Sequence, residues 1–245
     1  MNLLKNIKNH FIKHCKKLST TVIVFDENTE KQIEYQKDLP KNVLVKGKDK
    51  SNLVRLHKNL LARNVVISFG ANTKNCKCTL DDSGDSAGLD INAIFLAGEN
   101  SELSIGKRTG MNGTKIWLGN GSKCHIGDDC RFSYEIIIRT TDGHTILDNA
   151  TNEVVNHQKQ PCVIGDRCWI GLRTIINKNV QLANDTIVGS GSVLVKSYTE
   201  PYTAIAGNPA KIIKQGIRHD RRTIYNYELD TKAQKAKSHV DVEIE

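Results

Sequence analysis

The stretch IGDRCWIGLRTIINKNVQLANDTIVGSGSVLVKSYT, residues 164–199, decides the fold. An aliphatic residue recurs at every sixth position, at Ile164, Ile170, Ile176, Leu182, Val188 and Leu194. Four residues after each aliphatic stands a mostly small or β-branched residue: Cys168, Thr174, Val180, Thr186, Ser192 and Tyr198. At ordinary apolar frequencies such a series arises by chance roughly once in a hundred trials, so the stretch is a repeat.

A period of six fits neither a helix, at 3.6 residues, nor a half-buried strand, at two. It predicts three short strands per superhelical turn, with each aliphatic pointing into a narrow prism. One coil cannot cover its own apolar face, so coils must stack and share backbone hydrogen bonds. The sequence therefore predicts an all-β fold, a parallel β-helix.

The same phase extends toward the N-terminus, at Ile105, Met111 and Trp117 and, after a nine-residue step, at Ile126, Phe132, Ile138 and His144. Before it, aliphatic bursts separated by Gly, Asn, Asp and Ser predict irregular early coils. The β-helix domain is thus expected over residues 43–206. Between His144 and Ile164 the pattern fails and the chain is polar, so residues 145–161 are expected to leave the prism as a loop.

The two ends of the chain have different patterns. Residues 1–20 place apolar residues on one helical side and lysines mostly elsewhere, which predicts a short amphipathic helix. This helix either packs on its own protein or touches a membrane surface weakly. It is too short and charged to span a bilayer. With a predicted hairpin at residues 21–35 it forms an N-terminal cap, residues 1–42. Residues 207–245 are expected to form a C-terminal extension, weakly helical from about Asp230.

Amino-acid composition limits the kinds of partner and the cellular compartment to expect. The formal net charge is +8, but Lys and Arg are spread along the chain. The charge favours an anionic partner, and its even spread argues against nucleic acid. The seven cysteines contain no CxxC pair, and Cys130 and Cys168 take small-residue places of the repeat. They are expected to be reduced wall residues of a cytoplasmic protein.

Several segments resemble a known family. VIGDRCWIG (163–171), GSGSVLVK (189–196) and AIAGNPAKIIK (204–214) resemble the hexapeptide-repeat acyltransferases. IIIRTTDGHTILD (136–148), followed by Asn156, resembles the bacterial capsular-polysaccharide and lipopolysaccharide O-acetyltransferases of that family. The resemblance implies a left-handed β-helix, acetyl-coenzyme A as co-substrate, a carbohydrate acceptor and a homotrimer. The protein would be located in the cytoplasm or at the inner face of the membrane.

Acetyl transfer from a thioester to a sugar hydroxyl needs a base, because the alcohol is a poor nucleophile until it loses its proton. His144 is the predicted base, since histidine titrates near neutral pH. A packing role is the alternative for His144, and His125 and His157 are its rivals. Asp142, two residues earlier, is a candidate to orient the imidazole, or else a solvated turn residue. By the resemblance, Asn112 also lines the site.

The resemblance places Trp169 beside the acyl donor; otherwise Trp169 seals a subunit interface. Backbone N–H groups from Trp169 to Gly171, or the Trp169 indole N–H, are candidates to hold the negative oxygen of the intermediate. Coenzyme A is expected to meet Gly171, Ser190, Lys196, Lys211 and Lys214. Their alternative roles are a turn glycine, a wall serine and solvated lysines.

The acceptor is expected to contact Arg139, Asn156 and His157. No nucleophile elbow is present, which favours direct attack by the acceptor in a ternary complex. An N-acetyltransferase acting on an amino sugar is the closest alternative. A zinc lyase needs three histidines that converge on one metal. No two of His125, His144 and His157 form a close-spaced pair, so no metal is expected. A scaffold without activity is the remaining alternative.

Overall fold

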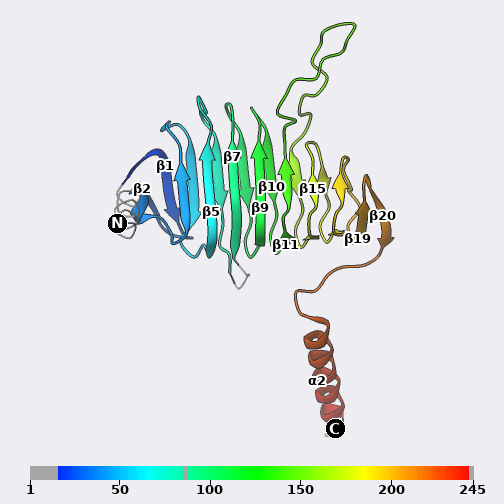
Figure 1. Cartoon of the computed structure of the whole chain (residues 1–245). Coiled ribbons are helices and arrows are strands. Elements are labelled where there is room, and N and C mark those ends of the chain that lie inside the picture. The colour runs from blue at the N-terminus through cyan, green and yellow to red at the C-terminus, as the bar shows by residue number, and fades with distance from the viewer. Residues whose placement is uncertain (1–15, 85–87, 243–245) are drawn as a thin grey trace, which may run out of the picture.

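The computed structural model describes residues 16–84 and 88–242. Its strands stack into one elongated prism with a hairpin at each end, a projecting loop and a C-terminal helix (Figure 1). The first half contains β1 (Lys17–Phe25), β2 (Glu30–Tyr35), a 3₁₀ turn (Gln36–Asp38), β3 (Val43–Lys46), β4 (Leu53–His57), β5 (Ala62–Phe69), β6 (Lys77–Leu80), β7 (Leu89–Leu96), β8 (Glu102–Ile105) and β9 (Gly110–Leu118). The second contains β10 (Lys123–Ile126), β11 (Arg131–Tyr134), β12 (Ile137–Arg139), β13 (Cys162–Ile164), β14 (Trp169–Ile170), β15 (Ile175–Ile176), β16 (Gln181–Leu182), β17 (Ile187–Val188), β18 (Val193–Leu194), β19 (Thr203–Gly207), β20 (Ala210–Gln215) and α2 (Ile224–Val242).

The six-residue repeat builds the core. Each of its six aliphatic side chains is at most 3% exposed. Ile164 pairs in parallel with Leu182, and Ile170 with Val188, so one coil is three hexads. The residues four positions after each aliphatic are buried as well, which makes them wall residues. The predicted all-β class, a parallel β-helix, is confirmed.

The N-terminal coils are longer but share the same registers. Leu56, Leu80, Ile105 and Ile126 follow one another on neighbouring parallel strands, which confirms the predicted early coils. The inward position of Trp117 is wrong, because Ile116 and Leu118 are buried and Trp117 points outward, half-buried. From Met111 to Ile116 β9 has five residues where the next coil, from Phe132 to Ile138, has six, so a hexad count places the inward residue one position too far along the chain.

The inward place of His144 is wrong too, because β12 ends at Arg139 and the chain then leaves the prism. The predicted loop is thus confirmed, and it projects from the prism in Figure 1.

The predicted hairpin is confirmed as β1 and β2, and β1 also pairs in parallel with β4. The helix expected over residues 1–20 is wrong at its end, since β1 begins at Lys17 and Thr20 and Val22 alternate into the core. Residues 1–15 lie outside the described part.

At the C-terminal end, the GNPAK sequence reverses the chain between β19 and β20 through the cis peptide Asn208–Pro209. α2 confirms the helical tail but begins before Asp230. Thr223 caps it, because its hydroxyl accepts a hydrogen bond from Asn226 N at 3.3 Å. In the described residues no helix is long and apolar enough to cross a bilayer.

Candidate active site

The base of the projecting loop is closed by three polar side chains. Asn156 Nδ2 donates to the Asp142 carboxylate and to His144 O, each at 2.8 Å. Asn156 Oδ1 accepts from Ile146 N at 2.9 Å. Lys178 Nζ forms an ion pair with Asp142 and donates to Asn156 O at 3.0 Å. This Asp142–Asn156–Lys178 clamp holds both ends of the loop against the prism.

The clamp fixes the backbone at His144 but leaves the imidazole in solvent. His144 is exposed, and in the described residues its ring has no hydrogen-bond partner. The Asp142 carboxylate contacts Lys178 and Asn156 instead of the imidazole, and these contacts lower its pKa. An orienting role for Asp142 therefore stays a prediction.

A hollow of about 520 Å³ lies beside the clamp. Its lining includes Phe95, Trp117, Arg139 and Gly143, and Gly143 directly precedes His144 in the chain. The Arg139 guanidinium carbon lies 5.9 Å from the centre of the Trp117 ring. The hollow thus joins an aromatic surface, a positive charge and the histidine loop, a combination suited to an acidic sugar.

Trp169 lies on β14 with 48% of its surface exposed. Its ring centre is 6.2 Å from that of His219, in the segment between β20 and α2. Both His219 ring nitrogens are buried, and within the described part of the chain neither has a hydrogen-bond partner. Burial, and next the charge of Arg131, lower the pKa of His219. Sequence reasoning missed His219, whose only signal was its place in the polar RHDR stretch after the GNPAK segment.

The backbone donors expected for the negative oxygen are already occupied. Trp169 N donates to Thr186 O at 2.9 Å, and Gly171 N donates to Val188 O at 2.8 Å. Both bonds belong to the ladder between coils, so these two amides are already paired within the chain, and a backbone donor to the negative oxygen stays a prediction. The indole N–H of Trp169 remains as a candidate.

The residues expected to meet coenzyme A divide into two groups. Lys196 and Lys211 line one hollow of about 340 Å³, where Lys196 Nζ lies 5.8 Å from the Tyr198 ring centre. Ser190 and Lys214 are exposed outside that hollow. Gly171 is buried, and a Cβ there would lie 2.6 Å from Val188 O. Gly171 therefore has a packing role, whatever it does toward a ligand.

Lys196 is near the loop base as well, because it follows β18. β18 lies two strand intervals from β12, through β15. Two intervals correspond to about 10 Å. The charged hollow is thus close enough to share one extended ligand with the loop.

The remaining candidates lie apart. Asn112 stands near the start of β9, contacts Arg63 and donates to Phe132 O at 3.1 Å. His157 is exposed beside the clamp. His125 lies on β10 and contacts Ser104 Oγ at 2.8 Å. Across residues 16–84 and 88–242, no three His, Cys, Asp or Glu side chains gather to hold a metal ion.

Comparison with known proteins gives a consistent picture. The chain is 32% identical over 127 residues to the polysialic acid O-acetyltransferase of Escherichia coli O1:K1 / APEC, which covers 52% of this chain and 41% of that protein. It is 26% identical over 135 residues to the galactoside O-acetyltransferase of Escherichia coli (strain K12), covering 47% of this chain and 66% of that protein. The chain thus spans between about two fifths and two thirds of these relatives. No protein-family model matches it.

The crystal structure of the polySia specific acetyltransferase NeuO has the same fold, with a TM-score of 0.56 at 24% identity over 80% of this chain and 91% of that one. The six-residue repeat, the stacked parallel coils and the two sequence matches all support the same similarity. The chain is thus similar over part of its length to O-acetyltransferases, and it has the fold of NeuO.

Proposed function

We propose that the chain is an O-acetyltransferase that moves the acetyl group of acetyl-coenzyme A to a hydroxyl of an acidic sugar in a bacterial surface glycan. The observation that carries the proposal is the position of His144. It stands on a loop whose base is clamped by Asp142 and Asn156, next to a hollow that contains Trp117 and Arg139. Two relatives named as acetyltransferases of glycan or sugar hydroxyls support the same chemistry.

In this mechanism the sugar hydroxyl oxygen attacks the thioester carbonyl carbon while His144 accepts the hydroxyl proton. The Trp169 indole N–H is the candidate donor to the negative oxygen that develops. Collapse of the intermediate breaks the carbon–sulfur bond, and the proton held by His144 passes to the departing coenzyme A sulfur. No acyl-enzyme forms, because the acceptor attacks directly.

Charge supports the positions of both ligands. Arg139 supplies a guanidinium for a sugar carboxylate, a pairing that is strong when bidentate. Lys196 and Lys211, in one hollow, suit the phosphates of coenzyme A. The Asn156 side chain is used in holding the loop. The exposed His157 next to it is the residue that an acceptor would contact.

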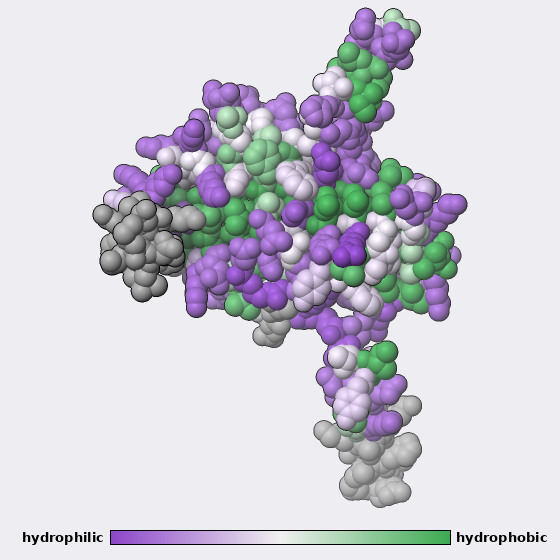
Figure 2. Space-filling view, in the orientation of Figure 1, coloured by the Kyte–Doolittle hydropathy of each residue, from purple (hydrophilic) through white to green (hydrophobic). Residues whose placement is uncertain are grey.

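A homotrimer is part of the proposal. Figure 2 shows an apolar patch on the projecting loop, away from the body of the prism. Ile146, Leu147 and Val155 are each at least 50% exposed there. Such a patch on a protruding loop marks a contact surface for a neighbouring chain. The six described cysteines are buried and unpaired, which supports a cytoplasmic location.

The test is acetyl transfer from labelled acetyl-coenzyme A to a panel of acidic, neutral and amino-sugar glycans. We expect coenzyme A release with an acidic glycan, and an alkali-labile ester on the product. An alkali-stable amide would instead assign the chain to the N-acetyltransferases. The proposal would be refuted if coenzyme A were released without any glycan. It would also be refuted if no acceptor caused coenzyme A release.

A further inference from the structure

One column of outward side chains runs across five neighbouring strands of the prism. The strand registers pair Lys46 with Ser68, Ser68 with Phe95, Phe95 with Trp117, and Trp117 with Arg139. We call these five residues the outward file. The residues that precede them, Val45, Ile67, Ile94, Ile116 and Ile138, are at most 6% exposed and form the core beneath. Side chains alternate along a strand, so the file faces solvent throughout.

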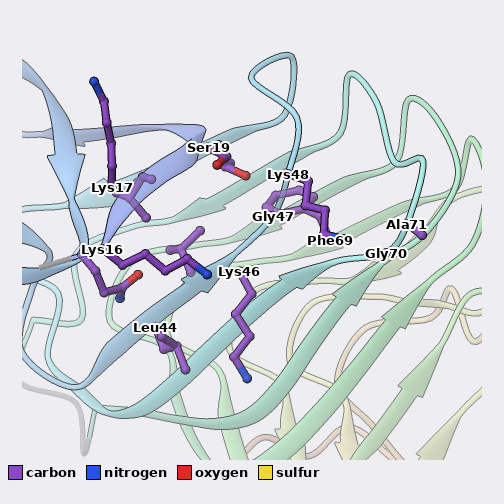
Figure 3. Close-up of a pocket in the computed structure, with 14 residues that line it drawn as sticks. Lys16, Lys17, Ser19, Leu44, Lys46, Gly47, Lys48, Phe69, Gly70 and Ala71 are labelled. Carbon is purple, nitrogen blue, oxygen red and sulfur yellow. The ribbon is translucent and has the colours of Figure 1, made fainter. Parts of the chain in front are cut away.

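The file links the active-site hollow to a distant point of the molecule. It crosses four strand intervals, from β3 through β5, β7 and β9 to β12. At the usual strand spacing this is about 19 Å. The Arg139 end opens into the hollow beside the histidine loop, and the Lys46 end opens into a second hollow of about 420 Å³ (Figure 3).

The second hollow is strongly basic. Lys16, Lys17, Lys46 and Lys48 are among its lining residues, and no acidic residue is. In Figure 3, Lys16 extends across the hollow and Lys48 folds toward Phe69, whereas Lys17 points away. Nothing within residues 16–84 and 88–242 forms an ion pair with any of these four lysines. Uncompensated cations around a half-apolar floor suit an anionic group carried on a ring.

The middle of the file is aromatic. Phe95 is 37% exposed, and it lines the active-site hollow together with Trp117 and the small residues Gly98 and Gly119. Glycine at position 70 leaves room for the Phe95 ring, because a Cβ there would lie 3.2 Å from Phe95 Cζ. Rings with open faces bind flat apolar surfaces, and the C–H face of a sugar is one.

We propose that the outward file is a track for an extended acidic glycan chain. A carboxylate-bearing sugar binds in the Lys46 hollow, intermediate sugars lie across Phe95 and Trp117, and the sugar to be modified reaches Arg139 and the histidine loop. The proposal rests on the proposed function and narrows its acceptor to a polymer several sugars long.

Binding is measured without acetyl-coenzyme A. The chain has two tryptophans, so Trp169→Phe leaves Trp117 as the only indole emitter. In that background we titrate acidic oligosaccharides of increasing length and follow Trp117 fluorescence. We expect quenching whose affinity rises with length. Phe95→Ala and the double variant Lys46→Ala/Lys48→Ala should each weaken long-chain binding about 3- to 10-fold, as loss of one ring or charge contact implies.

Matched variants separate the track from general charge. Lys77→Ala removes an exposed lysine of the other sheet, and Tyr35→Ala removes a ring that is 38% exposed, close to the value for Phe95. Neither should alter affinity. Equal losses in these controls, equal affinity for single sugars and long chains, or equal affinity for neutral chains would overturn the track. Competition by inorganic phosphate or by anionic lipid vesicles at matched charge would do the same.

The two proposals fail separately. If acidic chains bind with the expected length dependence but accept no acetyl group, the track stands and the proposed function falls. If acetyl is transferred at a rate that does not depend on chain length or on Phe95, the function stands and the track falls.

Discussion

The amide nitrogen of Asn156 lies 2.8 Å from the carboxylate of Asp142 and thereby ties together the two ends of the projecting loop. The same side chain accepts from Ile146 N and donates to His144 O. One amide thus fixes the backbone at His144 and Ile146 and also holds the Asp142 side chain that precedes the candidate base. The loop tip beyond it is exposed and carries only local bonds, so the position of His144 depends on this clamp.

Asn156→Ala should therefore lower kcat/KM about 10- to 100-fold, as misplacement of a catalytic group by an ångström does. Thermal stability should change little, because the loop is outside the core. Asn149→Ala is the control, since Asn149 is exposed in the same loop and its side chain makes no hydrogen bond in the described structure. Equal activity of both variants would mean that the clamp does not position the base.

The clamp should also depend on pH. The Lys178 ion pair, and next the Asn156 hydrogen bond, lower the pKa of Asp142 below its ordinary value of 3.8. Stability from a lowered carboxyl pKa is complete above the unfolded value and is lost as pH falls through the folded one. Lys178→Met should raise the pKa of Asp142, so that the clamp opens at a higher pH. Hydrogen exchange at the Ile146 amide, which donates to Asn156, measures this opening. An unchanged exchange profile in Lys178→Met would show that the ion pair does not hold the loop.

His144→Ala should reduce turnover by about 10²- to 10⁴-fold, the usual contribution of a general base. The melting temperature should stay nearly constant, because the ring is exposed and makes no hydrogen bond to any residue that the structure describes. His157→Ala tests the rival base, because His157 is exposed in the same loop and is proposed to meet the acceptor. If His157→Ala loses activity and His144→Ala keeps it, the base is His157.

The sequence predicted the parts of the molecule that burial dictates. The six aliphatic residues that recur from Ile164 to Leu194 had to point inward, because a six-residue period allows no other packing. Trp117 was misplaced because the step from Met111 to Ile116 has five residues where the next coil, from Phe132 to Ile138, has six, and a hexad count does not detect this shortening. Lys178 reaches Asp142 only because coil stacking brings together residues 36 positions apart. No local pattern carries that contact.

His219 was missed for a similar reason. Its contact with Trp169 depends on the path by which the chain returns across β14 after β20. A return path of this kind leaves no periodic signal in the sequence, and the segment reads as a polar linker. By contrast, His144 lies in the TTDGH segment, Lys196 in GSGSVLVK and Lys211 in GNPAK, so these candidates could be named from the sequence alone.

His219→Phe should keep the ring contact with Trp169 and remove two buried nitrogens that lack partners. Removing such groups should stabilise the fold by about 1 kcal/mol. Burial lowers the pKa of His219, and Arg131 adds to this while Asp185 and Asp220 oppose it. The wild type should therefore lose stability as pH falls through the unfolded value of 6.5, and the variant should lack that loss. Thermal unfolding between pH 8 and pH 5 tests this, and parallel curves for the two proteins would contradict it.

Gly171→Ala separates the packing role of this glycine from a role in donor binding. The added Cβ would lie 2.6 Å from Val188 O and from Ser190 N, two backbone atoms of the next coil. Because Gly171 N bonds to Val188 O, the coils cannot separate without breaking the ladder. We expect a loss of about 1–3 kcal/mol in the free energy of unfolding, as for overpacked cores. Gly191→Ala is the control, since its Cβ meets nothing and only its φ of +71° is unfavourable, which costs about 1 kcal/mol. A larger loss for Gly171→Ala supports close packing of the coils. Equal losses, with acetyl transfer abolished only in Gly171→Ala, would instead assign the glycine to the path of the acyl donor.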